Sequence, residues 1–106
     1  MKNAPEPRAD AITLPGLMAA LSDPARVEIV RSLAEGGEAA CGTFEVGVSK
    51  ATRSHHLRVL REAGITRTRA DGTRRMVSLR REDLDARFPG LLDAVLAAAA
   101  REAVPA

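Results

Sequence analysis

The sequence has few of the features that mark secreted or membrane proteins. It contains one cysteine, Cys41, so a disulfide bond within the chain is excluded. No apolar run approaches the roughly 20 residues that span a bilayer. The first ten residues, MKNAPEPRAD, contain no apolar segment of the kind found in a signal peptide. We therefore expect a cytoplasmic protein that does not contact a membrane.

Aromatic residues are also scarce, at 2% of the 106 residues, although 45% of the chain is hydrophobic. Alanine, leucine and valine must therefore fill the core, which favours packed helices. One domain of this length is modestly stable alone, so a partner subunit would help. The polar, proline-containing residues 1–11 predict a flexible tail that precedes a single domain of residues 12–104.

Groups that could carry catalysis or bind a metal are few. A stable metal site needs three or four convergent ligands, and the sequence offers mainly Cys41, His55 and His56. The two histidines are adjacent, so on a helix their side chains diverge by about 100°. No set of nucleophile, base and orienting group is present, and no phosphate-binding loop. We expect no metal, no cofactor and no enzymatic activity.

Residues 49–64, SKATRSHHLRVLREAG, predict a sharply bounded amphipathic helix. Ser49 is a good N-cap, and Gly64 is the residue type that most easily ends a helix in the left-handed conformation. Helical periodicity places one set on the buried side: Arg53, His56, Leu57, Leu60 and Gly64. The opposite side carries Ala51, Thr52, His55, Arg58 and Glu62.

The exposed start of this helix is small and polar, so it can approach base edges in a major groove. The candidate base-reading residues are Lys50, Ala51, Thr52, Ser54 and His55.

Residues 65–79, ITRTRADGTRRMVSL, predict two short strands around Asp71-Gly72, joined by a type I′ turn. Arginines 67, 69, 74 and 75 line this hairpin. Residues 49–81 carry ten Lys/Arg against two acidic residues, a balance of +8, which leaves −6 for the remainder because the whole chain carries +2. A capped helix followed by an arginine-rich hairpin is typical of a winged helix-turn-helix that binds a polyanion.

The rest of the chain predicts further helices. A first helix covers residues 12–21, and a second, capped by Asp23 with Pro24 at its first position, covers 24–35. We expect the second to bury Val27, Val30, Leu33 and Ala34. One or two helical turns are expected at 42–45, with Phe44 and Val46 packed inward. Residues 81–88 predict a short helix and 91–104 a final one.

The apolar stripe of the final helix is wider than so small a domain needs. It can pack back on its own domain or form a dimer interface together with the first helix, and the width favours the dimer. The predicted interface residues are Leu14, Leu17, Met18, Leu91, Leu92, Val95, Leu96 and Ala99. The fold class is therefore mainly α with a small β-hairpin, a winged helix-turn-helix that dimerises through its first and last helices.

Three segments together resemble one protein family. LSDPARVEIVRSLAEG, SKATRSHHLRVLREAGI and ADGTRRMVSL resemble the opening segment, recognition helix and wing of the ArsR (ArsR/SmtB) family of bacterial transcription regulators. The resemblance covers roughly residues 14–79. It implies a homodimer on one palindromic site, and usually repression that a bound signal relieves. Many members sense metals through a C-x-C pair, but Cys41 stands alone here, so we expect a type that does not sense metals.

The resemblance also assigns roles. It places the base-reading candidates at the groove-reading positions of the family and gives His56 a structural role. The candidates for phosphate and wing contacts are Arg53, Arg58, Arg67, Arg69, Arg74 and Arg75. Arg53 departs from the family pattern, because a small apolar residue is usual there. Its stem must run along the core and its head must reach solvent or phosphate.

The sequence thus predicts a sequence-specific DNA-binding regulator, a repressor that acts as a homodimer on a palindromic operator. One alternative is a winged-helix module that docks an acidic protein surface, and another is an architectural DNA binder with little specificity. A third is a repressor that responds to oxidants through Cys41, whereas the simpler interpretation of Cys41 is a small residue that fills space. The inducing signal is not encoded in any recognisable pattern.

Overall fold

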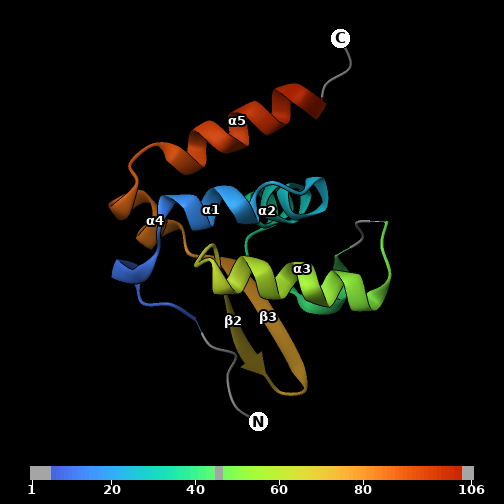
Figure 1. Ribbon diagram of the computed structural model, residues 1–106. Coiled ribbons are helices and arrows are strands. Elements are labelled where there is room, and N and C mark those ends of the chain that lie inside the picture. The colour runs from blue at the N-terminus through green and yellow to red at the C-terminus, as the bar shows by residue number, and fades with distance from the viewer. Residues whose placement is uncertain (1–5, 45–46, 104–106) are drawn as a thin grey trace.

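The computed structural model of the chain describes residues 6–44 and 47–103. Within these ranges the elements, in chain order, are η1 (Ala9–Ala11), α1 (Leu14–Ala20), α2 (Pro24–Gly36), β1 (Ala39–Ala40), η2 (Cys41–Thr43), α3 (Lys50–Glu62), β2 (Thr66–Asp71), β3 (Arg74–Leu79), α4 (Arg81–Arg87) and α5 (Leu91–Ala103). Figure 1 shows α5 along one side of the molecule, α1 and α2 in the middle, and α3 with the β2–β3 hairpin on the opposite side. A mainly α fold with a small hairpin is therefore confirmed.

Side-chain caps define where the early helices begin. The hydroxyl of Thr13 accepts a hydrogen bond from the backbone N–H of Gly16, so α1 starts at Leu14 rather than at Ile12. Asp23 caps α2 as predicted, accepting from the N–H of Ala25 at 2.8 Å. This bond to the charged form holds the pKa of Asp23 below its ordinary value.

The helical faces differ in part from the predicted ones. Helix α2 buries Ile29, Val30 and Leu33, a stripe with the i, i+1, i+4 spacing of one helix side. Val27 is only half-buried and Ala34 is exposed, because both lie at the edges of that stripe.

The sheet has three strands rather than two, in the order β1-β3-β2. The predicted hairpin is present, but β1 was not anticipated: Ala39 pairs with Val77 and Ala40 with Met76. The helical turns expected at 42–45 are replaced by the 3-10 helix η2 at 41–43. A two-residue alanine strand has no pattern of its own, since its pairing partner lies far along the chain. Phe44 is buried as predicted, whereas Glu45 and Val46 lie outside the described residues.

The hairpin loop is displaced by one residue from the prediction. Asp71 pairs with Arg74, so the loop is Gly72-Thr73 rather than Asp71-Gly72. Only Gly72 of these residues has a positive φ, at 63°. A type I′ turn needs positive φ at both central residues, so the prediction of that turn is wrong; the observed pattern fits type II′, which has glycine first.

The segment before α1 packs against the end of α3. Ile12 is 1% exposed and lies against Gly64, whose φ is 87°. A Cβ atom on Gly64 would lie 2.5 Å from Cγ1 of Ile12 and 2.7 Å from its Cδ1. The turn from α3 into β2 therefore needs glycine for two reasons, the backbone conformation and the space.

Residues 1–11 were expected to form a flexible tail, and residues 1–5 lie outside the described ranges. Two residues of the described part of this segment, Glu6 and Pro7, are hydrogen-bonded to the domain. The Glu6 carboxylate accepts the backbone N–H of Thr68 at 2.6 Å, on the free edge of β2. The Pro7 carbonyl accepts from the buried Arg80, also at 2.6 Å.

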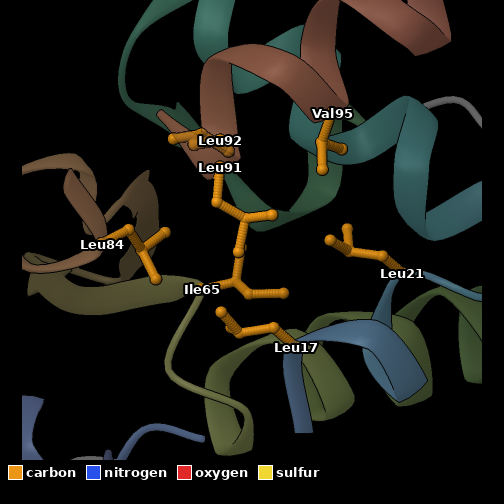
Figure 2. A pocket seen from close by; sticks show the side chains of 7 residues that line it. All are labelled: Leu17, Leu21, Ile65, Leu84, Leu91, Leu92 and Val95. Atoms are coloured by element: carbon orange, nitrogen blue, oxygen red, sulfur yellow. The ribbon is translucent and has the colours of Figure 1, made fainter. Parts of the chain in front are cut away.

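The first half of α5 is attached to the domain through apolar side chains. Figure 2 shows Leu17, Leu21, Ile65, Leu84, Leu91, Leu92 and Val95 converging on one small space. Its volume is about 20 Å³, close to what a single water molecule occupies, and its apolar lining gives water no hydrogen-bond partner. This space belongs to the core and does not accommodate an organic ligand.

Within the described ranges, no helix combines the length and the apolar character that crossing a lipid bilayer requires.

Gly64→Ala is expected to lower the free energy of unfolding by at least about 2 kcal/mol, because it adds a left-handed backbone cost to a clash with Ile12. Gly72→Ala is the matched control. Its φ is also positive, but nothing lies within 4 Å of the added Cβ, so a loss of about 1 kcal/mol is expected. Urea unfolding followed by circular dichroism measures both. Equal losses would show that the contact with Ile12 contributes nothing.

Candidate nucleic-acid interface

The start of α3 is capped and open to solvent. Ser49 accepts a hydrogen bond from the N–H of Thr52 and donates its own hydroxyl proton to Oγ1 of Thr52 at 3.0 Å. The Thr52 hydroxyl thereby keeps its own proton free to donate outward. All five predicted base-reading residues are exposed: Lys50, Ala51, Thr52, Ser54 and His55.

His55 is oriented by the next turn of α3. Its Nδ1 lies 3.3 Å from Nη2 of Arg58. A guanidinium can only donate, so Nδ1 is the acceptor and the proton of the neutral ring is on Nε2. The exposed end of the imidazole is then a hydrogen-bond donor, which suits acceptor atoms such as those of guanine in the major groove.

The buried side of α3 matches the predicted stripe. His56, Leu57 and Leu60 are 6%, 8% and 0% exposed. Arg53 is half-buried, and its Nη1 lies 3.4 Å from the carbonyl oxygen of Phe44, to which it donates. Its head therefore ties α3 to the segment after η2, instead of extending to solvent as the sequence suggested.

Arg26 of α2 positions α3, and the sequence analysis did not identify it. Its Nε donates to the carbonyl of Ala20 at 2.6 Å, and its Nη1 donates to Nδ1 of His56 at 3.1 Å. One side chain thus connects the end of α1, α2 and α3. His56 has the structural role that the family resemblance implied.

The arginines of the hairpin divide between its two faces. Arg67 pairs with Ser78 and Arg69 with Met76, while Arg74 pairs with Asp71 on the same face. Arg67, Arg69 and Arg74 are all exposed. Arg75 lies on the other face of β3, together with the buried Val77, and is half-buried.

Two of these arginines are held by carboxylates that the sequence analysis did not identify. Arg69 donates from Nε to Oε2 of Glu38 at 2.7 Å and from Nη2 to Oε1 at 2.5 Å. These bonds hold the pKa of Glu38 below its ordinary value and raise the pKa of Arg69. Arg67 donates to Asp83 at 3.3 Å, and Asp83 also accepts from Arg80 at 3.0 Å.

Cys41 lacks the surroundings of a reactive thiol. Burial raises the pKa of the thiol, although Arg75, Arg61 and Arg53 act in the opposite direction. The thiolate is therefore disfavoured, because the effect of burial outweighs that of the three guanidinium groups. In the part of the chain that the structure describes, no three His, Cys, Asp or Glu side chains lie close enough to share a metal ion.

Comparisons with known proteins agree with this geometry. The family model of the bacterial regulatory proteins of the arsR family matches residues 23–68. The uncharacterized HTH-type transcriptional regulator YceK of Bacillus subtilis is 44% identical over 79 residues, 70% of this chain and 77% of that protein.

Two solved structures resemble the whole fold. The transcriptional repressor BigR from Xylella fastidiosa has a TM-score of 0.66 at 30% identity, covering 88% of this chain and 89% of that one. A homodimeric winged helix-turn-helix DNA-binding domain from Mycobacterium bovis has a TM-score of 0.64 at 29% identity, covering 87% of this chain and 82% of that one. The predicted winged helix-turn-helix fold is thereby confirmed.

The two adjacent histidines give a test of the orientation of α3. His56→Ala should lower the free energy of unfolding by about 2 kcal/mol, because it leaves a cavity and deprives Arg26 of its acceptor. His55→Ala should change the free energy of unfolding by less than about 0.5 kcal/mol, since the side chain is exposed. Chemical denaturation measures the free energy of unfolding of both variants. A His56→Ala variant as stable as His55→Ala would contradict the structural role.

Proposed function

The chain belongs to the arsR family of bacterial regulatory proteins and is a transcriptional regulator with a DNA-binding fold, not an enzyme. From that premise we propose that it is a repressor, which acts in the cytoplasm as a homodimer on a palindromic operator. The observation that carries the proposal is that the α3 start and three hairpin arginines, 67, 69 and 74, are exposed. The helix and the hairpin that carry them lie on the side of the molecule away from α5 (Figure 1).

We assign base recognition to the first two turns of α3. The short polar side chains Lys50, Thr52, Ser54 and His55, with Ala51 among them, reach base edges without steric conflict. Thr52 and His55 each present a donor outward once their inward hydrogen bonds are made. These residues supply the choice of sequence.

Phosphate binding is assigned to the exposed cations beside this helix start. Arg58 on α3 and Arg74 at the tip of the hairpin are exposed and contribute affinity without sequence preference. Arg67 and Arg69 share the outer face of the hairpin, but carboxylates already bind their guanidinium groups, so we assign no phosphate contact to them. Arg53 supports the helix from its inner side, so we leave it out of the phosphate contacts.

The dimer interface is assigned to the exposed faces of α1 and α5. Leu14 and Met18 on α1 are 45% and 43% exposed, large fractions for leucine and methionine. A groove of about 510 Å³ runs between α5 and the α1–α2 corner, and Met18, Val95 and Ala99 are among its lining residues. Leu17 and Leu92 are 2% and 5% exposed, so they belong to the core of the protomer and are not available to a partner.

Leu91 and Leu96 are half-buried and pack against the protomer core, so they border the interface at most along one edge. The alternative of a protein-docking module predicts no preference for any DNA sequence, which the selection from random DNA described below tests.

Met18→Glu is expected to yield a folded monomer, because it places a charge on the proposed interface without entering the core. Sedimentation at micromolar concentration should show a dimer for the native chain and a monomer for the variant. Val48→Glu is the control, since Val48 is also exposed, at 39%, but lies just before α3. A native chain that sediments as a monomer would refute the proposed dimer.

The helix start and the wing are expected to make different contributions to DNA binding. Arg74→Ala should weaken binding to operator and random DNA together and lower the salt slope by about one unit. Thr52→Ala should cost about 1–3 kcal/mol on the operator and little on random DNA. The operator is first obtained by selecting bound sequences from random DNA, and titrations at several salt concentrations then follow.

A native protein that enriches no sequence from the random pool would favour the docking module or an architectural binder. An Arg74→Ala variant that loses only specificity would instead show that the wing reads bases, and that the roles proposed here are reversed.

A further inference from the structure

The bidentate ion pair between Glu38 and Arg69 joins the two outer strands of the sheet. Glu38 immediately precedes β1, and Arg69 is on β2, so the pair crosses the central strand β3. The side chains remain partly open to solvent, 55% for Arg69 and 31% for Glu38. The contact is therefore ordered by two hydrogen bonds but accessible to a competing anion.

A DNA phosphate would compete for the same atoms. Arginine presents Nε and Nη2 as one edge of a rigid fork, and that edge fits a carboxylate or a phosphate equally well. Glu38 occupies this edge of Arg69. Arg69 lies on the same strand face as Arg74, so it is aligned with the cations that we assign to the DNA backbone.

Moving Arg69 from Glu38 to a phosphate contributes little to the free energy of DNA binding. Ion pairs this exposed contribute only weakly to stability, so the exchange is possible. However, the released Glu38 carboxylate would be left beside the same phosphate, whose charge has the same sign. The attraction of Arg69 and the repulsion of Glu38 then largely cancel.

We propose that Glu38 is an internal competitor of the DNA backbone, which holds Arg69 and so limits the affinity of the protein for DNA of every sequence. This inference rests on the proposed function and adds to it a residue that limits the affinity for DNA. In the native protein Arg69 makes no lasting phosphate contact, and discrimination between sequences is left to α3.

The experiment uses Glu38→Gln, which removes the charge but keeps the size of the side chain. Binding to random duplex DNA, titrated at several salt concentrations, should become severalfold tighter, and the salt slope should steepen by about 0.9, the contribution of one added phosphate contact. Arg69→Gln alone should leave the slope of the native protein unchanged. The double variant should return to that slope.

Glu35→Gln is the matched control, because it makes the same change at an exposed glutamate three residues before Glu38 but leaves the carboxylate that holds Arg69. It should leave the salt slope unchanged. Asp83 is less suitable for this purpose, since it also bonds the buried Arg80 and its loss would disturb the fold. Thermal unfolding of each variant verifies that the domain remains folded.

Three results would overturn the inference. Glu38→Gln could steepen the slope equally in the presence of Arg69→Gln, which would show a diffuse effect of charge. It could also leave binding unchanged or weaken it, which would make the pair a support that presents Arg69 to DNA. A lower slope for Arg69→Gln alone would show that Arg69 already contacts phosphate. Native protein that binds no DNA at all would instead refute the proposed function itself.

Discussion

A hydrogen bond from the neighbouring helix α2 helps to fix the orientation of α3. Arg26 binds the carbonyl that ends α1 and the imidazole of His56, so the three helices meet at one guanidinium. Helix α3 must bury Leu57 and Leu60 while its first two turns remain open, and apolar packing alone allows rotation about the helix axis. A directional hydrogen bond to a buried ring opposes that rotation. The exposed face of α3 is therefore fixed by a contact on its hidden face.

Charge on the side that we propose to face DNA is distributed less simply than the sequence count suggests. The +8 balance of residues 49–81 treats every arginine as available, but Arg67 and Arg69 are bound by Asp83 and Glu38, two acidic residues from outside that segment. Glu38 belongs to the acidic remainder of the chain, yet folding brings it to the wing. The positive electrostatic field of this segment is thus weaker than its net charge of +8 predicts. Neighbouring carboxylates help to set how strongly the hairpin attracts phosphate.

Helices α1 and α5 each bury one face against the core and leave another face exposed to solvent. Leu17 of α1 and Leu92 of α5 complete the core, whereas Leu14, three residues before Leu17, and Met18, the next residue after it, are exposed. A helix with apolar residues on two faces cannot bury both of those faces within one small protomer. This constraint is the physical basis for assigning the remaining apolar face to a second copy.

Local chemistry determined much of this fold from the sequence alone: the Ser49 cap, the glycine at position 64 and the buried stripe between them each depend on neighbours within a few turns. The tertiary structure decided what depends on partners distant in the chain. The Arg26–His56 and Arg69–Glu38 contacts span 30 and 31 residues. The pairing of β1 and the place of the hairpin loop likewise follow from register with a partner strand. Periodicity reveals which side of an element is buried, but the particular group it meets depends on how the elements pack.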